Sequence, residues 1–135
     1  MTAEVQAFLA SLNRCLQAPA FLQEFYALFI GSSEEVREKF KNTDPVRQAQ
    51  VLGQSLYALA VAAQGPAGSP AWSGFNSLAE RHSRRGLDIR PELYDVWLDC
   101  LLRTARVHDP VFTPETEEAW RNTLSVGIEY LRSRH

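Results

Sequence analysis

Residues 78–101, LAERHSRRGLDIRPELYDVWLDCL, hold the most specific pattern in the chain. The one histidine of this stretch, His82, lies one turn after Leu78 and shortly before a break in the helical pattern at Gly86. After the break, Pro91 marks the start of a second helix, because proline is favoured in the first turn of a helix. One face of that helix carries apolar residues at helical spacing: Leu93, Val96, Trp97 and Leu101. A lone histidine near a helix end is usually structural, so the role of His82 depends on the rest of the chain.

Helical signals continue on both sides of this stretch. Each proline that follows a capping side chain predicts the start of a helix, and weaker caps precede two further prolines. The strong pairs are Asp44-Pro45, Ser69-Pro70 and Thr113-Pro114, and the weaker ones are Ala18-Pro19 and Arg90-Pro91. Apolar residues also repeat at helical spacing, for example at Val5, Phe8, Leu12 and Leu16, and at Trp120, Leu124, Ile128 and Leu131. Since no segment alternates every two residues, the sequence predicts an all-α domain.

Composition excludes several classes of protein. The chain has 135 residues, of which 45% are hydrophobic, and this predicts a single domain, residues 1–135, with one core. A formal net charge of −2 and dispersed basic residues argue against binding to nucleic acid. The longest apolar run, residues 56–63, is too short to span a membrane, and the N-terminus lacks the pattern of a signal peptide. Cys15 and Cys100 lack the CxxC spacing and are expected to be reduced thiols in a cytoplasmic protein.

An ordered set of short motifs runs through the whole chain. In sequence order it comprises Phe25-Tyr26, Phe40 before Lys41-Asn42, Gln48 and Leu52, Leu78 to His82, Pro91 to Tyr94, and Glu118-Ala119-Trp120. This set resembles the globin family, in particular the haem domain of flavohaemoglobins and related single-domain bacterial globins. The resemblance implies the globin fold, a three-over-three helical sandwich with a short or absent D helix. It places helices at residues 3–17, 19–31, 45–64, 70–85, 91–108 and 114–134, with a short one near 33–40.

The resemblance assigns the iron ligand to His82. Haem b, iron protoporphyrin IX, is flat and mostly apolar, and it needs an apolar slot with one good axial ligand. His82 matches the proximal histidine of globins, and the carbonyl of Leu78 would accept a hydrogen bond from its second ring nitrogen. Tyr94 matches a tyrosine that supports the proximal histidine in flavohaemoglobins. Apolar residues expected on the proximal side are Leu78, Leu87, Ile89, Trp97 and Leu98.

The distal side of the haem would carry polar groups that face the bound gas. Phe40 matches the aromatic residue that packs flat against the haem, and Tyr26 matches a tyrosine whose hydroxyl donates a hydrogen bond to oxygen. Gln48 is the expected second polar residue, one turn before Leu52 on the same helix face. Gln50 is an alternative, and so is a register that places Leu52 and the next residue distally. If Tyr26 and Gln48 both point inward, two donors would slow the release of oxygen.

The sequence departs from the flavohaemoglobin pattern at two points. We expect no flavin reductase domain within these residues, so any cycle that consumes electrons would need a separate reductase. His135 stands where the resemblance implies a glutamate that completes the proximal charge relay. Arg81 or Arg85 would meet the haem propionates or stay solvated.

Three functions therefore stay open on the sequence alone. The first is reversible binding of a diatomic gas, O2, NO or CO, at a five-coordinate haem iron held by His82. The second is a haem enzyme, a nitric oxide dioxygenase or a peroxidase-like protein with a separate reductase, against which the missing glutamate argues. The third is a haem-free, globin-like interaction module in which His82 is structural.

Overall fold

A computed structural model describes residues 2–65 and 90–133 of the chain. The described residues form six α-helices: α1 (Ala3–Leu16), α2 (Phe21–Ser32), α3 (Glu34–Phe40), α4 (Pro45–Ala62), α6 (Glu92–His108) and α7 (Pro114–Ser133). These described parts contain no β-strand, and the predicted all-α class is confirmed. The helix expected at 70–85 falls outside the described residues.

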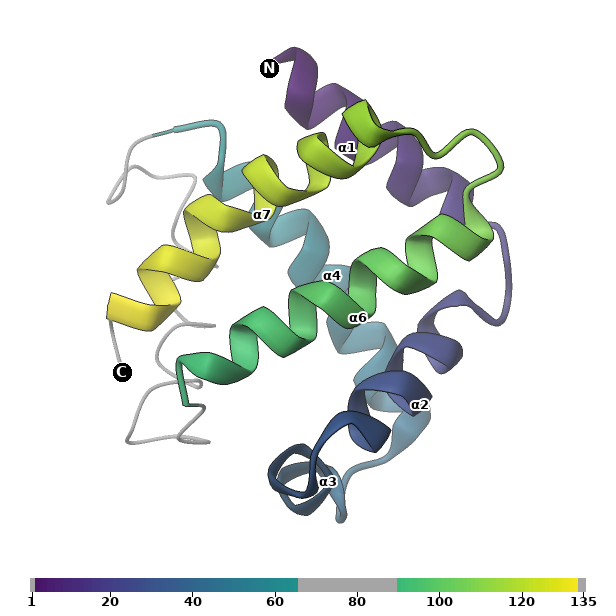
Figure 1. The fold of residues 1–135 in the computed structure, drawn as a ribbon, viewed down its shortest axis with the longest axis vertical. Helices are drawn as coiled ribbons and strands as arrows, with labels where there is room; N and C mark the ends of the chain where they lie inside the picture. Colours follow the sequence, from purple (N-terminus) through teal and green to yellow (C-terminus); the bar gives the residue numbers. More distant parts are fainter. Residues whose placement is uncertain (1, 66–89, 134–135) are drawn as a thin grey trace.

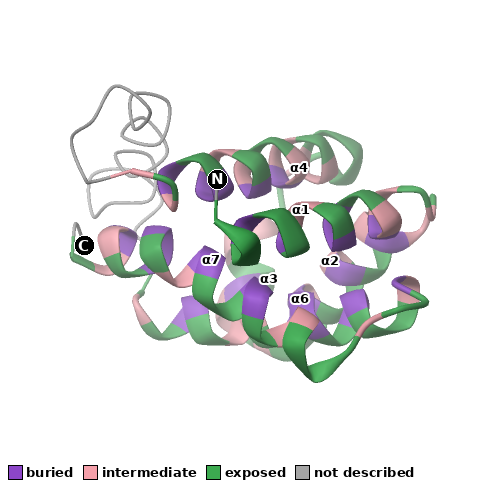
Figure 2. Cartoon of the chain, turned by 90° about the horizontal axis from the view of Figure 1, so that it is seen from above, coloured by how far each residue is buried: buried purple, intermediate pink, exposed green. Residues whose placement is uncertain are grey.

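The helices pack in two layers around one apolar core. In Figure 1, α6 and α7 lie in front of α4, and α2 and α3 lie together at one end of the molecule. The most extensive contacts join α1 to α7 and α2 to α6, and α4 also packs against α7. Figure 2 shows that the buried residues of these helices turn toward one another. The largest fully buried side chains are Trp120, Phe8, Phe21 and Phe25.

The helix starts predicted at Pro45 and Pro114 are confirmed at atomic detail, whereas α6 begins at Glu92, one residue after Pro91. An Asp44 carboxylate oxygen accepts a hydrogen bond from the backbone N–H of Val46 at 3.0 Å, and Pro45 is the first residue of α4. The Thr113 hydroxyl accepts in the same way from Thr116 at 3.2 Å, ahead of α7. Such caps satisfy backbone donors that a helix start otherwise leaves without partners.

The predicted start of the second helix at Pro19 is wrong by two residues. The helix α2 begins at Phe21, and its N-cap, Ala20, makes no side-chain hydrogen bond. Alanine at position 18 offers no side-chain acceptor either, so proline alone did not fix the boundary. The backbone instead turns between the two helices, with the N–H of Phe21 donating to the carbonyl of Ala18 at 3.1 Å.

The link between α3 and α4 is short. Residues 41–44, all of them described, contain no helix, which confirms that a D helix is absent here. A short link keeps the end of α3 close to the start of α4, and the two meet at the mouth of the cavity described below. Among the described residues, no helix is long and apolar enough to cross a membrane.

A buried polar network, which the sequence did not indicate, joins the first helix, α1, to the last helix, α7. The Asp109 carboxylate is fully buried and accepts hydrogen bonds from the Arg14 guanidinium at 2.6 and 3.0 Å and from the Ser11 hydroxyl at 2.6 Å. The Trp120 indole N–H donates to the same hydroxyl at 2.9 Å, and the backbone N–H of Val111 donates to Asp109 at 3.0 Å. The network therefore locks α1 to α7 and to the turn between α6 and α7.

Candidate binding cavity

One cavity, of about 490 Å³, opens among the ends of α2, α3, α4, α6 and α7. Its interior is mainly apolar, with aromatic and aliphatic side chains from all five helices. The interior residues include Phe29, Val36, Phe40, Val51, Leu52, Leu59, Leu93, Trp97, Ile128 and Leu131. A volume of this size is typical of sites for drug-sized or cofactor-sized ligands.

One face of α4 supplies the longest side of the cavity. Its lining residues recur every three or four positions, which is the spacing that brings side chains to one face of a helix. They are Asp44, Arg47, Gln48, Val51, Leu52, Ser55 and Leu59. Phe29 lies three residues after Tyr26 on α2, and Leu131 three residues after Ile128 on α7, so each of these helices also presents one face.

Six of the residues singled out from the sequence meet in this cavity. They are Tyr26, Phe40, Gln48, Leu52, Tyr94 and Trp97. Leu98, which was also expected near the ligand, is a described residue but does not line the cavity. Gln50, the alternative to Gln48, is exposed and does not line it either. The other predicted site residues, Leu78, His82, Leu87 and Ile89, lie outside the described residues.

Two hydroxyl groups that line the cavity donate hydrogen bonds to the backbone of α4. The Tyr26 hydroxyl donates to the main-chain carbonyl of Gln48 at 2.9 Å, and the Ser55 hydroxyl donates to the carbonyl of Val51 at 2.8 Å. Burial raises the pKa of the Tyr26 phenol well above its usual range. Burial also raises the pKa of Tyr94 to about 12, against a smaller opposing effect of Arg132. Both phenols are therefore neutral hydrogen-bonding groups at physiological pH.

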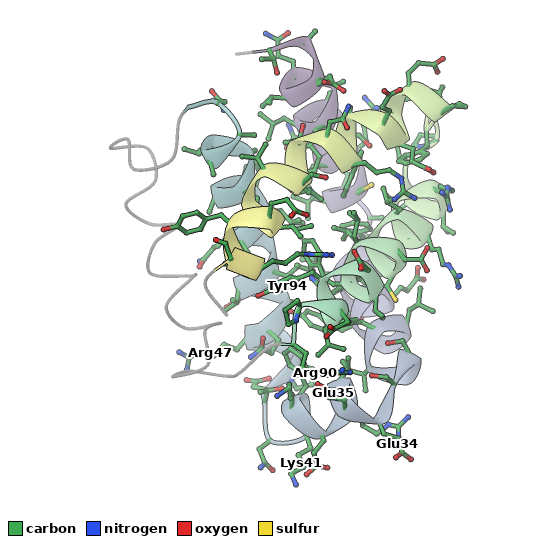
Figure 3. All side chains as sticks on the ribbon, turned by 60° about the vertical axis from the view of Figure 1, so that its left-hand side comes forward. Glu34, Glu35, Lys41, Arg47, Arg90 and Tyr94 are labelled. Carbon is green, nitrogen blue, oxygen red and sulfur yellow. The ribbon has the colours of Figure 1, made fainter. Side chains whose placement is uncertain are left out.

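The mouth of the cavity is polar and carries charges of both signs. Lys39 at the end of α3 and Arg47 near the start of α4 are the cations among its described lining residues, and Asp44, just before α4, is the anion. Arg90, just before α6, donates from its Nε to both carboxylate oxygens of Glu35 of α3 at 2.7 and 2.8 Å, and its Nη2 lies 2.6 Å from one of them; Figure 3 shows these two side chains close together. That pair joins two of the elements that surround the cavity, although exposed pairs of this kind add little stability.

The sequence did not indicate about two-thirds of the described lining residues. Phe29 and Leu59 could have been found, because they extend the apolar faces of Tyr26 and Leu52 by one and two turns. Arg47 directly precedes Gln48, but its place at the mouth depends on how α4 meets α3. Ile128 belongs to the predicted apolar stripe of α7, yet the stripe does not distinguish core residues from cavity residues.

This arrangement defines an all-α protein whose helices enclose a mainly apolar cavity with charged residues at its mouth. The globin family model matches residues 23–131, and the chain belongs to the globin family. It is also similar to a Pseudomonas aeruginosa PAO1 protein, PA3967, which is structurally highly homologous to a human haemoglobin. That chain is 37% identical, with a TM-score of 0.91, and the match covers 97% of each chain. No match was found among the curated proteins.

These findings confirm the predicted globin fold, a three-over-three helical sandwich. They also confirm the prediction of a bacterial globin. The family implies that the chain is a haem globin and that its ligand is a diatomic gas. The cavity fits haem in its chemistry: its interior is apolar like the porphyrin ring, and its mouth carries two cations that suit propionate groups.

Proposed function

We propose that this chain is a single globin domain, residues 1–135, that holds one haem b in the cavity and reversibly binds a diatomic gas. One observation carries the proposal: residues from five helices converge on an apolar cavity whose charged lining residues are two cations, Lys39 and Arg47, and one carboxylate, Asp44. A charged site deep inside would suit a polar substrate, whereas this distribution of charge suits a flat apolar cofactor with carboxylates at one edge.

Haem would supply an iron atom that binds the gas, and the chain would supply the surroundings. Phe29, Phe40, Leu52 and Trp97 would pack against the ring and exclude water from it. His82 is the protein ligand that we propose for the iron, with its second ring nitrogen donating to the carbonyl of Leu78. Tyr26 and Gln48, which line the cavity from α2 and α4, would face the gas on the side opposite His82. The gas is O2, NO or CO, since each binds a five-coordinate haem iron.

The spectrum of the reduced, haem-loaded protein under different gases tests the gas-binding function. Adding carbon monoxide or oxygen should shift the main absorption band, and flushing with argon should reverse the shift. Reversal matters because oxidation of the iron would also change the spectrum, but permanently. An unchanged spectrum under both gases would contradict the proposal.

Arg47 should help to retain the haem by pairing with a propionate. Arg47 is exposed at the mouth, so an Arg47→Gln variant should lose haem only about two to five times faster than the wild type. Transfer of haem to an excess of apomyoglobin measures this rate. Arg103→Gln is a matched control, because Arg103 is an exposed arginine of α6 that does not line the cavity. Equal rates for the two variants would show that Arg47 does not hold a propionate.

A further inference from the structure

A shallow groove runs between α2 and α6 on the surface of the protein, and it shares no lining residue with the cavity described above. The helix α2 contributes Leu28 and Gly31 to the groove, and α6 contributes Asp95, Asp99 and Arg103. All five of these residues are exposed. In Figure 1, α6 lies in the front layer of the molecule, so its outward face is open to a partner.

The exposed face of α6 carries its charges in a definite order. Glu92, Asp95 and Asp99 make the first half of this face acidic, and Arg103 and Arg106 make the second half basic. Neighbouring members of the set are three or four residues apart, so all five lie on one face of the helix. Each of these side chains is about half exposed or more. The order is symmetric about Asp99, because each acidic residue before it has a basic residue at the same separation after it.

A second copy of the chain matches this order with opposite charges. If two α6 helices packed antiparallel about a twofold axis at Asp99, each Arg103 would lie opposite an Asp95, and each Arg106 opposite a Glu92. Each contact would occur twice, as in every twofold interface. The two Asp99 carboxylates would meet at the axis, but each is already paired with its own Arg103 at 3.0 Å. Parallel packing would instead bring like charges together, so the charges select the antiparallel arrangement.

The α2 side of the groove is complementary to itself in shape. Leu28 is 38% exposed and stands beside Gly31, where an added Cβ would meet no atom within 4 Å. If the same twofold axis passed between these two residues, Leu28 of each copy would enter the open space at Gly31 of the other. Burial of an apolar side chain supplies affinity that exposed ion pairs do not provide on their own.

We propose that the face formed by α2 and α6 is the interface of a homodimer, with the two α6 helices antiparallel about a twofold axis near Asp99. A partner of a single charge, such as a basic peptide, would meet a like-charged half of this face, whereas a second copy does not. The charged face from residue 92 to residue 106 extends over only about 21 Å, so we expect a weak dimer. The dimer does not depend on the proposed haem, because the groove and the cavity have no residue in common.

Sedimentation equilibrium of the chain at increasing concentration tests for the dimer. In about 20 mM salt, the mean mass should rise from 15.2 kDa toward twice that value by about 500 µM protein. Raising the salt to about 500 mM should lower the mean mass again, because salt screens exposed charges. A mean mass that stays at that of one chain throughout the low-salt series would overturn the proposal.

Two charge reversals then test which face forms the dimer. Arg103→Asp and Asp95→Arg should each weaken the dimer about tenfold or more, because each places like charges opposite one another twice. An equimolar mixture of the two variants should associate about as strongly as the wild type, since both contacts then join an aspartate to an arginine.

Arg121→Asp is the matched control for these reversals. Arg121 is an exposed arginine of α7 outside the groove, so its reversal should leave the dimer as strong as in the wild type. An equal loss in this control would trace the effect to net charge and overturn the proposal. A dimer that survives both single reversals, or a mixture of the two variants that stays monomeric, would also overturn it.

Discussion

Replacing His82 by alanine should abolish stable retention of haem. A globin pocket holds its cofactor by apolar packing and by one coordinate bond, and packing alone lets the cofactor exchange. His82 lies outside the described residues, so the expectation rests on the ordered motifs around it and on the cavity that the other helices form. After reconstitution and gel filtration, the wild type should carry one haem per chain, and the variant should carry almost none.

His108→Ala is the matched control for that experiment. His108 ends α6, contacts Glu24 through its ring nitrogen and packs nearly perpendicular to the ring of Phe21, with centroids 5.9 Å apart. It does not line the cavity, so its loss should leave the haem content unchanged. If His82→Ala retained haem as well as His108→Ala, the iron ligand would be another residue.

Replacing Asp109 by alanine should destabilise the fold by about 3 kcal/mol, which is a fall of about 10 °C in Tm. The carboxylate is fully buried, and it accepts hydrogen bonds from Arg14, Ser11 and the backbone of Val111. Its removal leaves Ser11 and part of the Arg14 guanidinium without their acceptor, and unpaired buried polar groups are costly. Thermal unfolding followed by circular dichroism measures the change.

Asp99→Ala controls for the loss of an acidic residue from the same region. Asp99 pairs with Arg103 on the surface of α6 with about half of its side chain exposed, so its loss should change Tm by at most a degree or two. Equal effects of the two substitutions would show that the buried network does not hold the ends of the fold together.

The same network predicts a dependence of stability on pH. Burial raises the pKa of Asp109, but hydrogen bonds from Arg14, Ser11 and Val111 outweigh it and hold the pKa below its ordinary value of 3.8. A carboxylate with a lowered folded-state pKa stabilises the fold above the unfolded-state value, and the benefit is lost as pH falls through the folded-state value. The free energy of unfolding should therefore fall below about pH 4, and less steeply in Asp109→Asn. An equal slope in that variant would exclude Asp109 as the cause.

The sequence predicted the helices well where two local signals agreed. At Pro45 and Pro114 a capping side chain and a proline coincide, and both helices begin there. At Pro19 the cap is missing, and the boundary is set by the turn and by burial of Phe21. Local signals are decisive only when tertiary packing does not compete with them.

Contacts between distant residues explain what the sequence could not predict. Ser11 and Asp109 are 98 residues apart in the chain, and no local pattern pairs them. The motif around Tyr26 placed that residue in the cavity, but only the structure shows its hydroxyl donating to the Gln48 carbonyl. The sequence alone does not decide whether Gln48 or Gln50 faces the cavity, because that depends on which face of α4 meets α2 and α7.

The proposal that the cavity holds one haem is tested by titrating the haem-free protein with haem and following the Soret band, the main absorption band of haem. The cavity of about 490 Å³ is large enough for one cofactor, so the band should sharpen, shift from that of free haem and saturate at one haem per chain. His82→Ala should give a weak, unsaturated change in the same titration. If the spectrum of the wild-type protein with haem stayed that of free haem throughout, the proposed haem site would be wrong, and the chain would be a globin without a cofactor.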